Sequence, residues 1–598
     1  MAVLVDDPAS FRADALAGFV AAYGRLVEVV PGASAVMRRG GVGEGKVAVV
    51  GGGGSGHYPA FMGLVGPGML GGAVVGEVFT SPSAEQVYVT GLALEAGAGV
   101  LFSYGNYAGD CLNFDLASER LRSVGVDCRT VVVTDDVASA GAEAVHLRRG
   151  VAGDLVVYKV AGAAADRGYS LAETEQVARR ANDRTRTIGI AMSGCVLPGA
   201  DEPLFSVADG QVEIGMGIHG EPGVSSVPRP PLRELAALMV DALLPEAASG
   251  SHRVAAVLNG LGATKYEELF GLWRHLADQF KLAGLELIAP EVGELVTSLD
   301  MAGCSLTLAW LDDELESLWL AGCDTPAFRR LATGGGDPAQ GDGGHPVSVR
   351  RTAAAGNSMN TPPAEASPQS RQAGAVAVSA FAAMLETVRE HESELGRLDA
   401  VAGDGDHGTG MVRGLTAALI AAEGAAAGGL GATLQAAGAA WSDRAGGTSG
   451  ALWGLLLDQV ARLLGDQDRP GVAELAHAIA SGAALLQSTG GAQPGDKTLL
   501  DTLVPFAAEL RHQAANGLDV ASAWSAAADV ARVAAHDTAN LSPRVGRARP
   551  LAERSVGHRD PGAVSMSLCI DAVTGVLLMR GADESPAPMS NGEASEPE

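Results

Sequence analysis

The chain has 598 residues, which is too long for one ordinary domain, so two or more domains are expected. Its 70 acidic and 42 basic residues give a net charge of −28, which argues against nucleic acid or an anionic membrane as a partner. Hydrophobic residues make up 47 % of the chain, but the longest apolar runs are short and interrupted by glycine, so no membrane span is expected.

The chain start and the cysteines indicate a cytoplasmic protein. The start carries Asp6, Asp7 and Asp14 and lacks the basic segment of a signal peptide. Six cysteines are scattered without a C-x-x-C pair, a pattern that favours unpaired thiols over a disulfide framework or a zinc site.

The first half alternates strand-like and helix-like segments, which predicts an α/β domain over residues 1–332 with sheets covered by helices. The expected helices include 171–182 and 232–244. The expected strands are 46–50, 73–78, 100–104, 129–134, 154–160, 188–192 and 254–258.

The first of these strands runs into a glycine-rich loop, K-V-A-V-V-G-G-G-G-S-G-H-Y-P-A, at 46–60. Its Gly51, Gly53 and Gly56 fit G-x-G-x-x-G, and Glu77 follows at the distance of a ribose-binding acid, so a dinucleotide site is one interpretation. The other is that the glycines admit a small substrate and that His57 is the functional residue.

Two more segments of this half place polar residues among glycines. Y-G-N-Y-A-G-D-C-L-N-F-D, at 104–115, begins where a strand ends, so Asp110 could act as a base or simply occupy a turn. V-E-I-G-M-G-I-H-G-E-P-G, at 212–223, exposes His219 to close approach by a ligand, although a hydrogen-bonded loop histidine would look the same.

Residues 333–374 are rich in Gly, Pro, Ser and Gln without apolar periodicity, which predicts a flexible linker. The tail at 584–598 has the composition of a disordered segment. Between them, 375–583 contains Ala-rich segments with apolar i, i+3, i+4 spacing and predicts an all-helical domain. The expected helical segments are 376–395, 410–426, 431–440, 472–488 and 520–535.

The helical half contains three closely spaced carboxylates in L-D-A-V-A-G-D-G-D-H-G-T-G-M, at 398–411. Asp399, Asp404 and Asp406 would repel one another without a cation, and hard oxygen ligands suit Mg²⁺. An EF-hand is excluded because Leu415 stands where its terminal glutamate would be. A helix-capping Asp/Gly turn remains the alternative.

Two later segments fit a nucleotide site. G-G-T-S-G, at 446–450, precedes a helix and can bind an anion through backbone N–H groups or merely cap that helix. In 546–563, Arg547 can bind phosphate, and the turn at Asp560, Pro561 and Gly562 can approach a base or ribose. A Walker A motif and a protein-kinase glycine loop are both missing from the sequence, so neither common class of phosphoryl-transfer enzyme fits.

Together these motifs resemble the ATP-dependent dihydroxyacetone kinases. The matching segments are G-G-G-S-G-H-Y-P, N-Y-A-G-D-x-x-N-F, G-M-G-I-H-G-E-P-G, L-D-x-x-x-G-D-G-D-H-G and A-E-R-S-V-G-H-R-D-P-G-A, the last with Ala552 where the family has Gly. They occur in both halves and in family order.

The resemblance implies an α/β ketose-binding domain followed by a helical barrel that binds Mg-ATP. It further implies that His219 captures the ketone covalently as a hemiaminal, that His57 and Asp110 act on the phosphorylated hydroxyl, and that the chain forms a homodimer with exchanged domains. The remaining implied site residues are Gly54, Ser55 and Gly56 against the substrate, Asp399, Asp404 and Asp406 on two Mg²⁺ ions, and His407, Gly408, Thr409, Gly410, Thr448, Ser449, Arg547, Asp560, Pro561 and Gly562 on the nucleotide.

One departure bears on the substrate. Many family members have K-N-Y-T-G-D where this chain has Gly105 and Ala108 in place of the lysine and threonine, which we expect to enlarge the pocket and to remove a donor. Dihydroxyacetone is therefore the first expectation and D- or L-erythrulose the alternative. A subunit of a phosphoenolpyruvate relay, a silent ketose sensor and a flavin-cyclising side activity are further alternatives.

Overall fold

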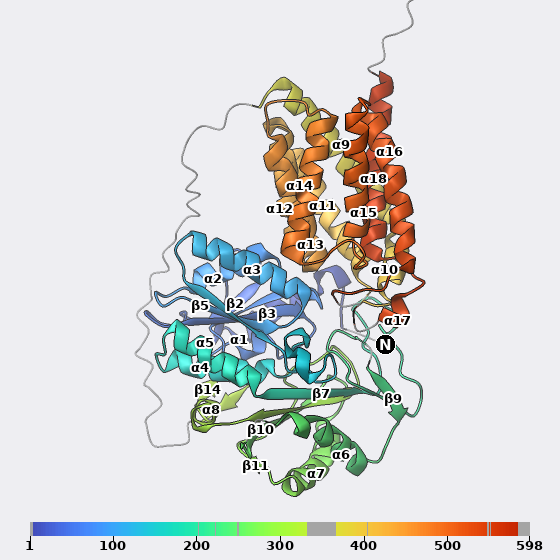
Figure 1. Cartoon of the computed structure of the whole chain (residues 1–598). Helices are drawn as coiled ribbons and strands as arrows, with labels where there is room; N and C mark the ends of the chain where they lie inside the picture. The colour runs from blue at the N-terminus through green and yellow to red at the C-terminus, as the bar shows by residue number, and fades with distance from the viewer. Residues whose placement is uncertain are drawn as a thin grey trace, which may run out of the picture.

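The computed structural model describes residues 4–583 except 201, 222, 248–249, 332–365, 404, 547–548 and 550–551. An α/β half and a helical half lie one above the other in Figure 1. The mixed α/β and all-helical architecture expected from the sequence is confirmed.

Two mixed sheets form the framework of the α/β half. The first has the order β1-β2-β4-β3-β5-β6, in which β4, β3, β5 and β6 run parallel and β1 and β2 are antiparallel. Its strands are β1 Val27–Val29, β2 Ala35–Arg38, β3 Ala48–Ser55, β4 Gly72–Val78, β5 Val100–Gly105 and β6 Cys128–Val133.

The second sheet has the order β11-β10-β13-β7-β8-β9, with β12 also paired to β10. Its strands are β7 Thr185–Ala191, β8 Gln211–Ile214, β9 Ser225–Pro228, β10 Arg253–Gly260, β11 Glu286–Leu287, β12 Glu291–Gly293 and β13 Gly303–Trp310. A small separate pair is formed by β14 Cys323–Asp324 and β15 Arg329–Arg330.

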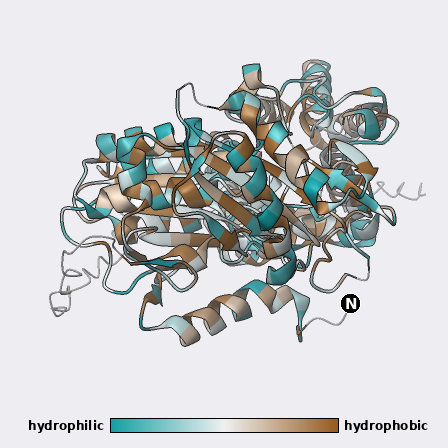
Figure 2. Cartoon of the chain, turned by 90° about the horizontal axis from the view of Figure 1, so that it is seen from below, coloured by the Kyte–Doolittle hydropathy of each residue, from teal (hydrophilic) through white to brown (hydrophobic). Residues whose placement is uncertain are grey.

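Helices cover these sheets in layers. In Figure 1, α2 and α3 lie above the first sheet, α4 and α5 lie between the two sheets, and α6 and α7 lie below the second. Figure 2 shows hydrophobic residues on the central strands and mixed hydropathy on the surrounding helices. The helices are α1 Phe11–Tyr23, α2 Ala84–Leu94, α3 Ala108–Ser123, α4 Asp154–Asp166, α5 Leu171–Asp183, α6 Leu232–Leu243, α7 Tyr266–Leu282 and α8 Asp313–Trp319.

The strand expected at 154–160 is wrong, because these residues form the first turns of α4. Every residue from Asp154 to Ala165 is buried, since α4 packs between the first sheet, α5 and α8. A helix that is buried on all sides carries a continuous apolar run, which periodicity alone does not distinguish from a buried strand.

The helical half is built from long helices that run side by side in Figure 1. They are α9 Pro368–Glu390, α10 Glu392–Asp399, α11 His407–Ala425, α12 Leu430–Ala445, α13 Gly447–Leu464, α14 Val472–Gly490, α15 Leu500–Ala515, α16 Val520–Asp537, the short α17 Ala552–Ser555 and α18 Pro561–Asp583. They surround an apolar cavity of about 920 Å³, lined by Phe381, Met384, Trp453, Phe506 and Trp524 among others.

Two expectations about the helical half need correction. The predicted linker ends too late, because α9 begins at Pro368 with Ser367 as its N-cap, so that 368–374 are helical; 333–365 lie outside the described residues.

The expectation that no apolar run could span a membrane fails for α18, whose Pro561–Met579 stretch is long and apolar enough by length and composition. That helix packs against α9, α15 and α16, as a core helix does. The tail at 584–598 also lies outside the described residues.

Candidate active site

The glycines of β3 are packed tightly against the chain itself. A Cβ atom at Gly53 would lie 2.6 Å from the ring of Phe61, and one at Gly54 would lie 2.6 Å from the backbone nitrogen of Thr80. The turn that follows has Gly56 at φ +99°, a conformation that side chains disfavour. The dinucleotide interpretation is wrong, because the loop is followed by the three-residue 3₁₀ turn Met62–Leu64 and not by a helix N-terminus that could bind a pyrophosphate.

This packing fixes His57, whose side chain is fully buried. Its Nδ1 lies 2.8 Å from the carbonyl oxygen of Thr297, which can only accept, so Nδ1 carries the proton in the neutral ring. The loop is held further by Leu299, whose N–H donates to the Gly56 carbonyl. The lone pair of a neutral His57 is therefore on Nε2, where it can accept a proton.

His219 meets His57 edge to face, with ring centroids 4.7 Å apart. His219 lies in the loop between β8 and β9 and is 5 % exposed. The ring of Tyr107 lies 4.2 Å from it, and Phe79 stacks on His57 at 4.9 Å. Residues from three distant parts of the α/β half thus form one aromatic pocket around two imidazoles.

Asp110 lies in the first turn of α3, where the helix dipole favours a negative charge. Its side chain is 7 % exposed. The hydroxyl of Ser55, two residues before His57, is buried and has no hydrogen-bond partner among the described residues. An unsatisfied hydroxyl costs free energy unless a ligand pairs with it, so Ser55 fits a substrate that carries hydroxyl groups.

The expected extra room at Gly105 is not present next to its backbone. A Cβ atom there would meet the Gly150 carbonyl oxygen at 3.1 Å and the Tyr107 ring at 3.2 Å. The space is filled by these neighbours, so the missing lysine removes a donor without opening a cavity at this point.

The acidic cluster of the helical half lies between α10 and α11. Asp399 ends α10 and accepts the N–H of Gly405 at 2.8 Å, and Asp406 immediately precedes α11. Loss of hydration and the nearby Asp399 raise the pKa of Asp406. Two mutually repelling oxygen donors at a cavity wall fit a hard divalent cation such as Mg²⁺. Asp404 lies outside the described residues, which contain no group of three metal-binding side chains.

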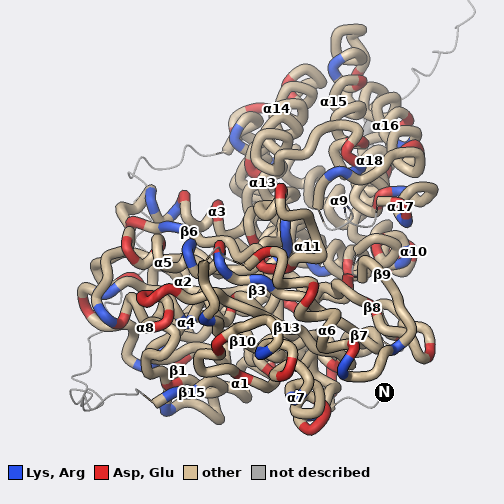
Figure 3. Tube along the Cα trace, turned by 60° about the horizontal axis from the view of Figure 1, so that its bottom comes forward, with Lys and Arg blue, Asp and Glu red and all other residues tan. Residues whose placement is uncertain are grey.

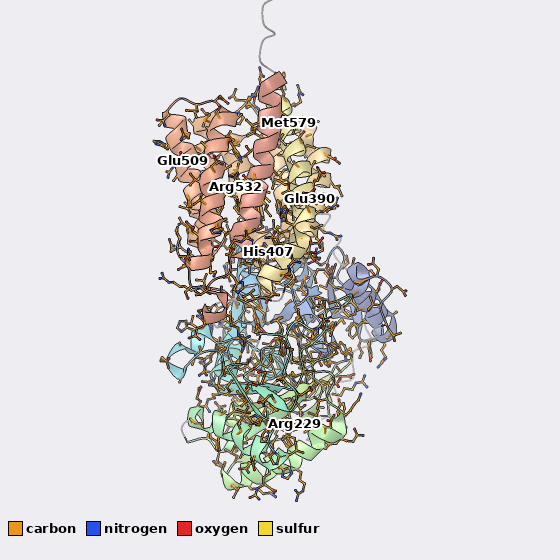
Figure 4. All side chains as sticks on the ribbon, turned by 90° about the vertical axis from the view of Figure 1, so that its right-hand side faces the viewer. Arg229, Glu390, His407, Glu509, Arg532 and Met579 are labelled. Carbon is orange, nitrogen blue, oxygen red and sulfur yellow. The ribbon has the colours of Figure 1, made fainter. Side chains whose placement is uncertain are left out.

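A cavity of about 830 Å³ connects this cluster with the α/β half. The end of the helical half that faces it carries His407, as Figure 4 shows, whereas Met579 is at the opposite end. Of the predicted site residues the cavity brings together Asp110, Asp399, Asp406, His407, Gly410, Thr448, Ser449, Asp560, Pro561 and Gly562.

The G-G-T-S-G segment begins α13 and faces this cavity, as expected for an anion-binding helix N-terminus. The N–H of Gly447 donates to the Ser81 carbonyl at 3.1 Å, and the Asn113 amide donates to the Gly447 carbonyl at 3.2 Å. Because Asn113 and Asp110 share α3, one helix contacts the start of α13 and also contributes Asp110 to the cavity wall.

Of the other residues expected to contact the nucleotide, some line the cavity and others do not. Asp560 caps α18 by accepting the N–H of Ala563 at 2.7 Å, and burial raises its pKa to about 7. Loss of hydration lowers the pKa of His407 to about 4, and its Nε2 lies 2.9 Å from the Ser565 hydroxyl. Gly408 and Thr409 are not among the described residues that line the cavity, and Arg547 lies outside the described residues.

Several cavity residues escaped the sequence reasoning. Lys497 and Thr498 come from G-D-K-T at 495–498, a lysine between two turn-forming segments that could have been noticed. The Lys497 ammonium donates to the Ser555 carbonyl at 2.6 Å and so ties the segment before α18 to the cavity. Thr80 is the other omission, because nothing local in the sequence marks it as a contact between the halves.

Comparisons with known proteins divide the chain into the same two halves. Residues 17–327 match the family model of the Dak1 domain, and residues 401–575 match that of the DAK2 domain. The two domains in one chain define the class of two-domain kinases. The chain belongs to the dihydroxyacetone kinase family.

Relatives of known activity cover almost the whole chain. A D-erythrulose kinase of Mycolicibacterium smegmatis is 51 % identical over 97 % of this chain and 99 % of its own length. An L-erythrulose kinase of Pectobacterium atrosepticum is 47 % identical over 96 % of this chain and 97 % of its own. The solved dihydroxyacetone kinase of C. freundii in complex with AMP-PNP and Mg²⁺ is 29 % identical, covers 96 % of this chain and 99 % of that one, and has a TM-score of 0.51.

Proposed function

We propose that this protein is an ATP-dependent erythrulose kinase that transfers the γ-phosphoryl group to a primary hydroxyl of the four-carbon ketose. The sequence alone put dihydroxyacetone first. The relatives at 51 % and 47 % identity are named erythrulose kinases, and they support the alternative substrate. Their match over both halves also favours direct use of ATP over a phosphoenolpyruvate relay, which we associate with the two domains on separate chains.

The single observation that carries the proposal is the pairing of His57 with His219 in the α/β half, together with a cavity that both halves line and that holds Asp110, Asp399 and Asp406. In the proposed reaction His219 holds the ketone carbon as a hemiaminal, which selects carbonyl compounds over glycerol. His57 Nε2 or the Asp110 carboxylate accepts the proton of the reacting hydroxyl as the phosphoryl group arrives.

The nucleotide is proposed to lie in the 830 Å³ cavity, with the G-G-T-S-G loop against its phosphates. Asp399 and Asp406, with Asp404, would hold Mg²⁺. The ion supplies neutralisation of phosphate charge, which matters in a chain with a net charge of −28. Figure 3 shows acidic and basic residues interspersed over both halves, so this compensation has to be local.

Steady-state kinetics with D-erythrulose, L-erythrulose and dihydroxyacetone, coupled to ADP production, tests the proposal. We expect one erythrulose enantiomer to have a kcat/KM about tenfold or more above that of dihydroxyacetone, as differential binding of one additional hydroxymethyl group allows. A higher kcat/KM for dihydroxyacetone would refute the erythrulose assignment. Activity with phosphoenolpyruvate as donor and none with ATP would refute the donor assignment.

A further inference from the structure

Next to His219 lies a buried row of four titratable side chains, and three of them have no role in the reaction proposed above. It runs from Asp136 through Arg149 and Glu221 to His219, and the exposed fractions of these four residues are 1 %, 9 %, 8 % and 5 %. Burying two carboxylates and a guanidinium costs several kcal/mol unless they compensate one another closely, so their placement beside a reactive imidazole calls for a function.

Arg149 is held firmly on one side. Its Nη2 lies 2.7 Å from Asp136 Oδ2 and donates to the Gly215 carbonyl at 3.0 Å, and its Nε donates to the same Asp136 oxygen at 2.9 Å. Burial opposes the charge of Arg149, but Asp136 and Glu221 raise its pKa above the ordinary value. The guanidinium is therefore a fixed positive charge.

The free face of this guanidinium is directed to Glu221. Arg149 Nη1 lies 4.0 Å from Glu221 Oε2, and both groups occupy the space beside Gly217. A Cβ atom at Gly217 would lie 2.6 Å from Arg149 Nη1 and closer still to Glu221. Because Gly217 has no side chain, Arg149 and Glu221 can approach each other in this space.

Glu221 in turn holds the loop and the ring of His219. Its Oε2 accepts the backbone N–H of His219 at 3.0 Å, and its Oε1 lies 3.6 Å from His219 Nδ1. Glu221 therefore lies on the Nδ1 side of the ring, which leaves Nε2 as the nitrogen directed away from it. Such contacts commonly shorten once the substrate is bound.

We propose that Glu221, positioned by Arg149 and Asp136, sets the tautomer of His219 and accepts its Nδ1 proton during ketose capture. This rests on the proposed function. The Nε2 lone pair forms a bond to the carbonyl carbon, the π pair of the carbonyl moves to oxygen, and that oxygen takes a proton from water. The Nδ1 proton passes to Glu221 Oε1 and then to water, so that protons balance. Glu221 and Arg149 are thus positioning residues for the nucleophile.

Glu221→Gln tests this, because the amide oxygen can still accept the His219 N–H but the group is a poor proton acceptor. A charge-assisted hydrogen bond is worth enough to change affinity about tenfold to a hundredfold, so we expect the KM for ketose to rise by that factor. The KM for Mg-ATP stays unchanged. With a ketose labelled with ¹³C at the carbonyl, the wild type shows a tetrahedral bound carbon and the variant retains a bound ketone signal.

The neighbouring pair Arg148 and Glu246 provides a matched control. Arg148 is buried next to Arg149 in the sequence and makes two bonds of 2.6 Å to Glu246. Glu246→Gln removes a partly buried carboxylate that is also paired with arginine, and we expect its capture signal to equal that of the wild type. Arg149→Lys is the second variant if Glu221→Gln does not fold. It keeps a positive charge beside Asp136, but the shorter side chain does not reach Glu221. We expect it to weaken ketose capture.

The outcomes separate the two proposals. A tetrahedral carbon in the wild type and an equal one in Glu221→Gln would overturn the role of Glu221 and leave the kinase assignment standing. No tetrahedral carbon in the wild type would overturn covalent capture itself. Equal loss of capture in Glu221→Gln and Glu246→Gln would show a general structural effect and would also overturn the positioning role.

Discussion

The hydroxyl of Thr80, two residues after β4 in the α/β half, lies 2.9 Å from Oδ2 of Asp406, which precedes α11 in the helical half. The same hydroxyl lies 3.0 Å from the Val78 carbonyl oxygen, so one proton serves two acceptors. A residue of the α/β half thereby reaches a carboxylate that we propose as a magnesium ligand. Further contacts across the same junction run from Ser83 and Gln86 to Asp443.

Replacement of Thr80 tests whether this contact orients the two halves for transfer. Thr80→Val keeps the shape and removes the donor, and we expect kcat to fall about tenfold because a hydrogen bond to a charged group is worth about 1.5 to 3 kcal/mol. Ketose affinity, measured by calorimetry without nucleotide, stays the same. Thr90→Val is the control, since Thr90 bonds to Gln86 within α2. An unchanged kcat in Thr80→Val contradicts the role.

His219→Ala tests the nucleophile. Without the imidazole the ketose is bound by hydrogen bonds alone, so we expect a KM increase of about a hundredfold or more and loss of discrimination against glycerol. Parallel kinetics with erythrulose and glycerol measure both. His391→Ala is the control, because the His391 ring bonds to the Thr387 carbonyl inside the helical half. Rejection of glycerol that survives in His219→Ala contradicts covalent capture.

The local motifs singled out several residues that the structure brings together at the cavity, and the reasons are physical. His57 and His219 stand in glycine-containing loops, and Asp110 follows Gly109 at the start of α3; glycines mark places of close backbone approach and are visible in the sequence. Helical periodicity likewise predicted α14 at 472–488, which buries one stripe, whereas the segment expected at 376–395 is divided between α9 and α10 at His391.

What the sequence could not predict depends on residues that meet across the fold. Thr80 and Asp406 are 326 positions apart, and Arg149 meets Glu221 only because the β6 side of one sheet lies against the β8–β9 loop of the other. The strand expected at 154–160 failed for the same reason, because burial on all sides of α4 removed its periodicity. The sequence predicted an enlarged pocket at Gly105, because it could not show that Tyr107 and Gly150 fill the space beside that residue.

Asp406→Asn tests the metal assignment. The change removes one charge from the cluster while keeping its size, so we expect calorimetry to show Mg-ATP affinity reduced about tenfold to a hundredfold. Capture of ¹³C-labelled ketose persists, because His219 lies in the other half. Asp519→Asn is the control, since Asp519 caps α16, is not among the described residues that line the 830 Å³ cavity, and Asn can still accept the Ser522 N–H. Simultaneous loss of ketose capture contradicts the assignment of the two binding steps to separate halves.

A last prediction concerns stability and pH through Asp135, which is fully buried after β6. Its two oxygens accept the N–H groups of Val151 at 2.8 Å and Gly153 at 2.7 Å, but burial dominates and raises its pKa from 3.8 to about 6. Between these values the unfolded chain has released the proton and the folded one retains it, so stability falls as pH rises. The loss amounts to about 3 kcal/mol by pH 6 and stays constant above it.

Asp135→Asn removes this titration. The amide also places an N–H₂ group against a backbone donor, so the variant is less stable overall, and the informative quantity is the difference in Tm between wild type and variant at each pH. We expect the wild type to lose its advantage progressively from pH 4 to pH 6. The pH dependence of stability has the opposite sign at Asp519, because hydrogen bonds with Ser522 lower its pKa. Asp519→Asn therefore loses a stabilisation that is present above pH 4 and disappears in acid. A Tm difference for Asp135→Asn that does not vary between pH 4 and pH 6 would mean that Asp135 is ionised in the folded protein throughout that range.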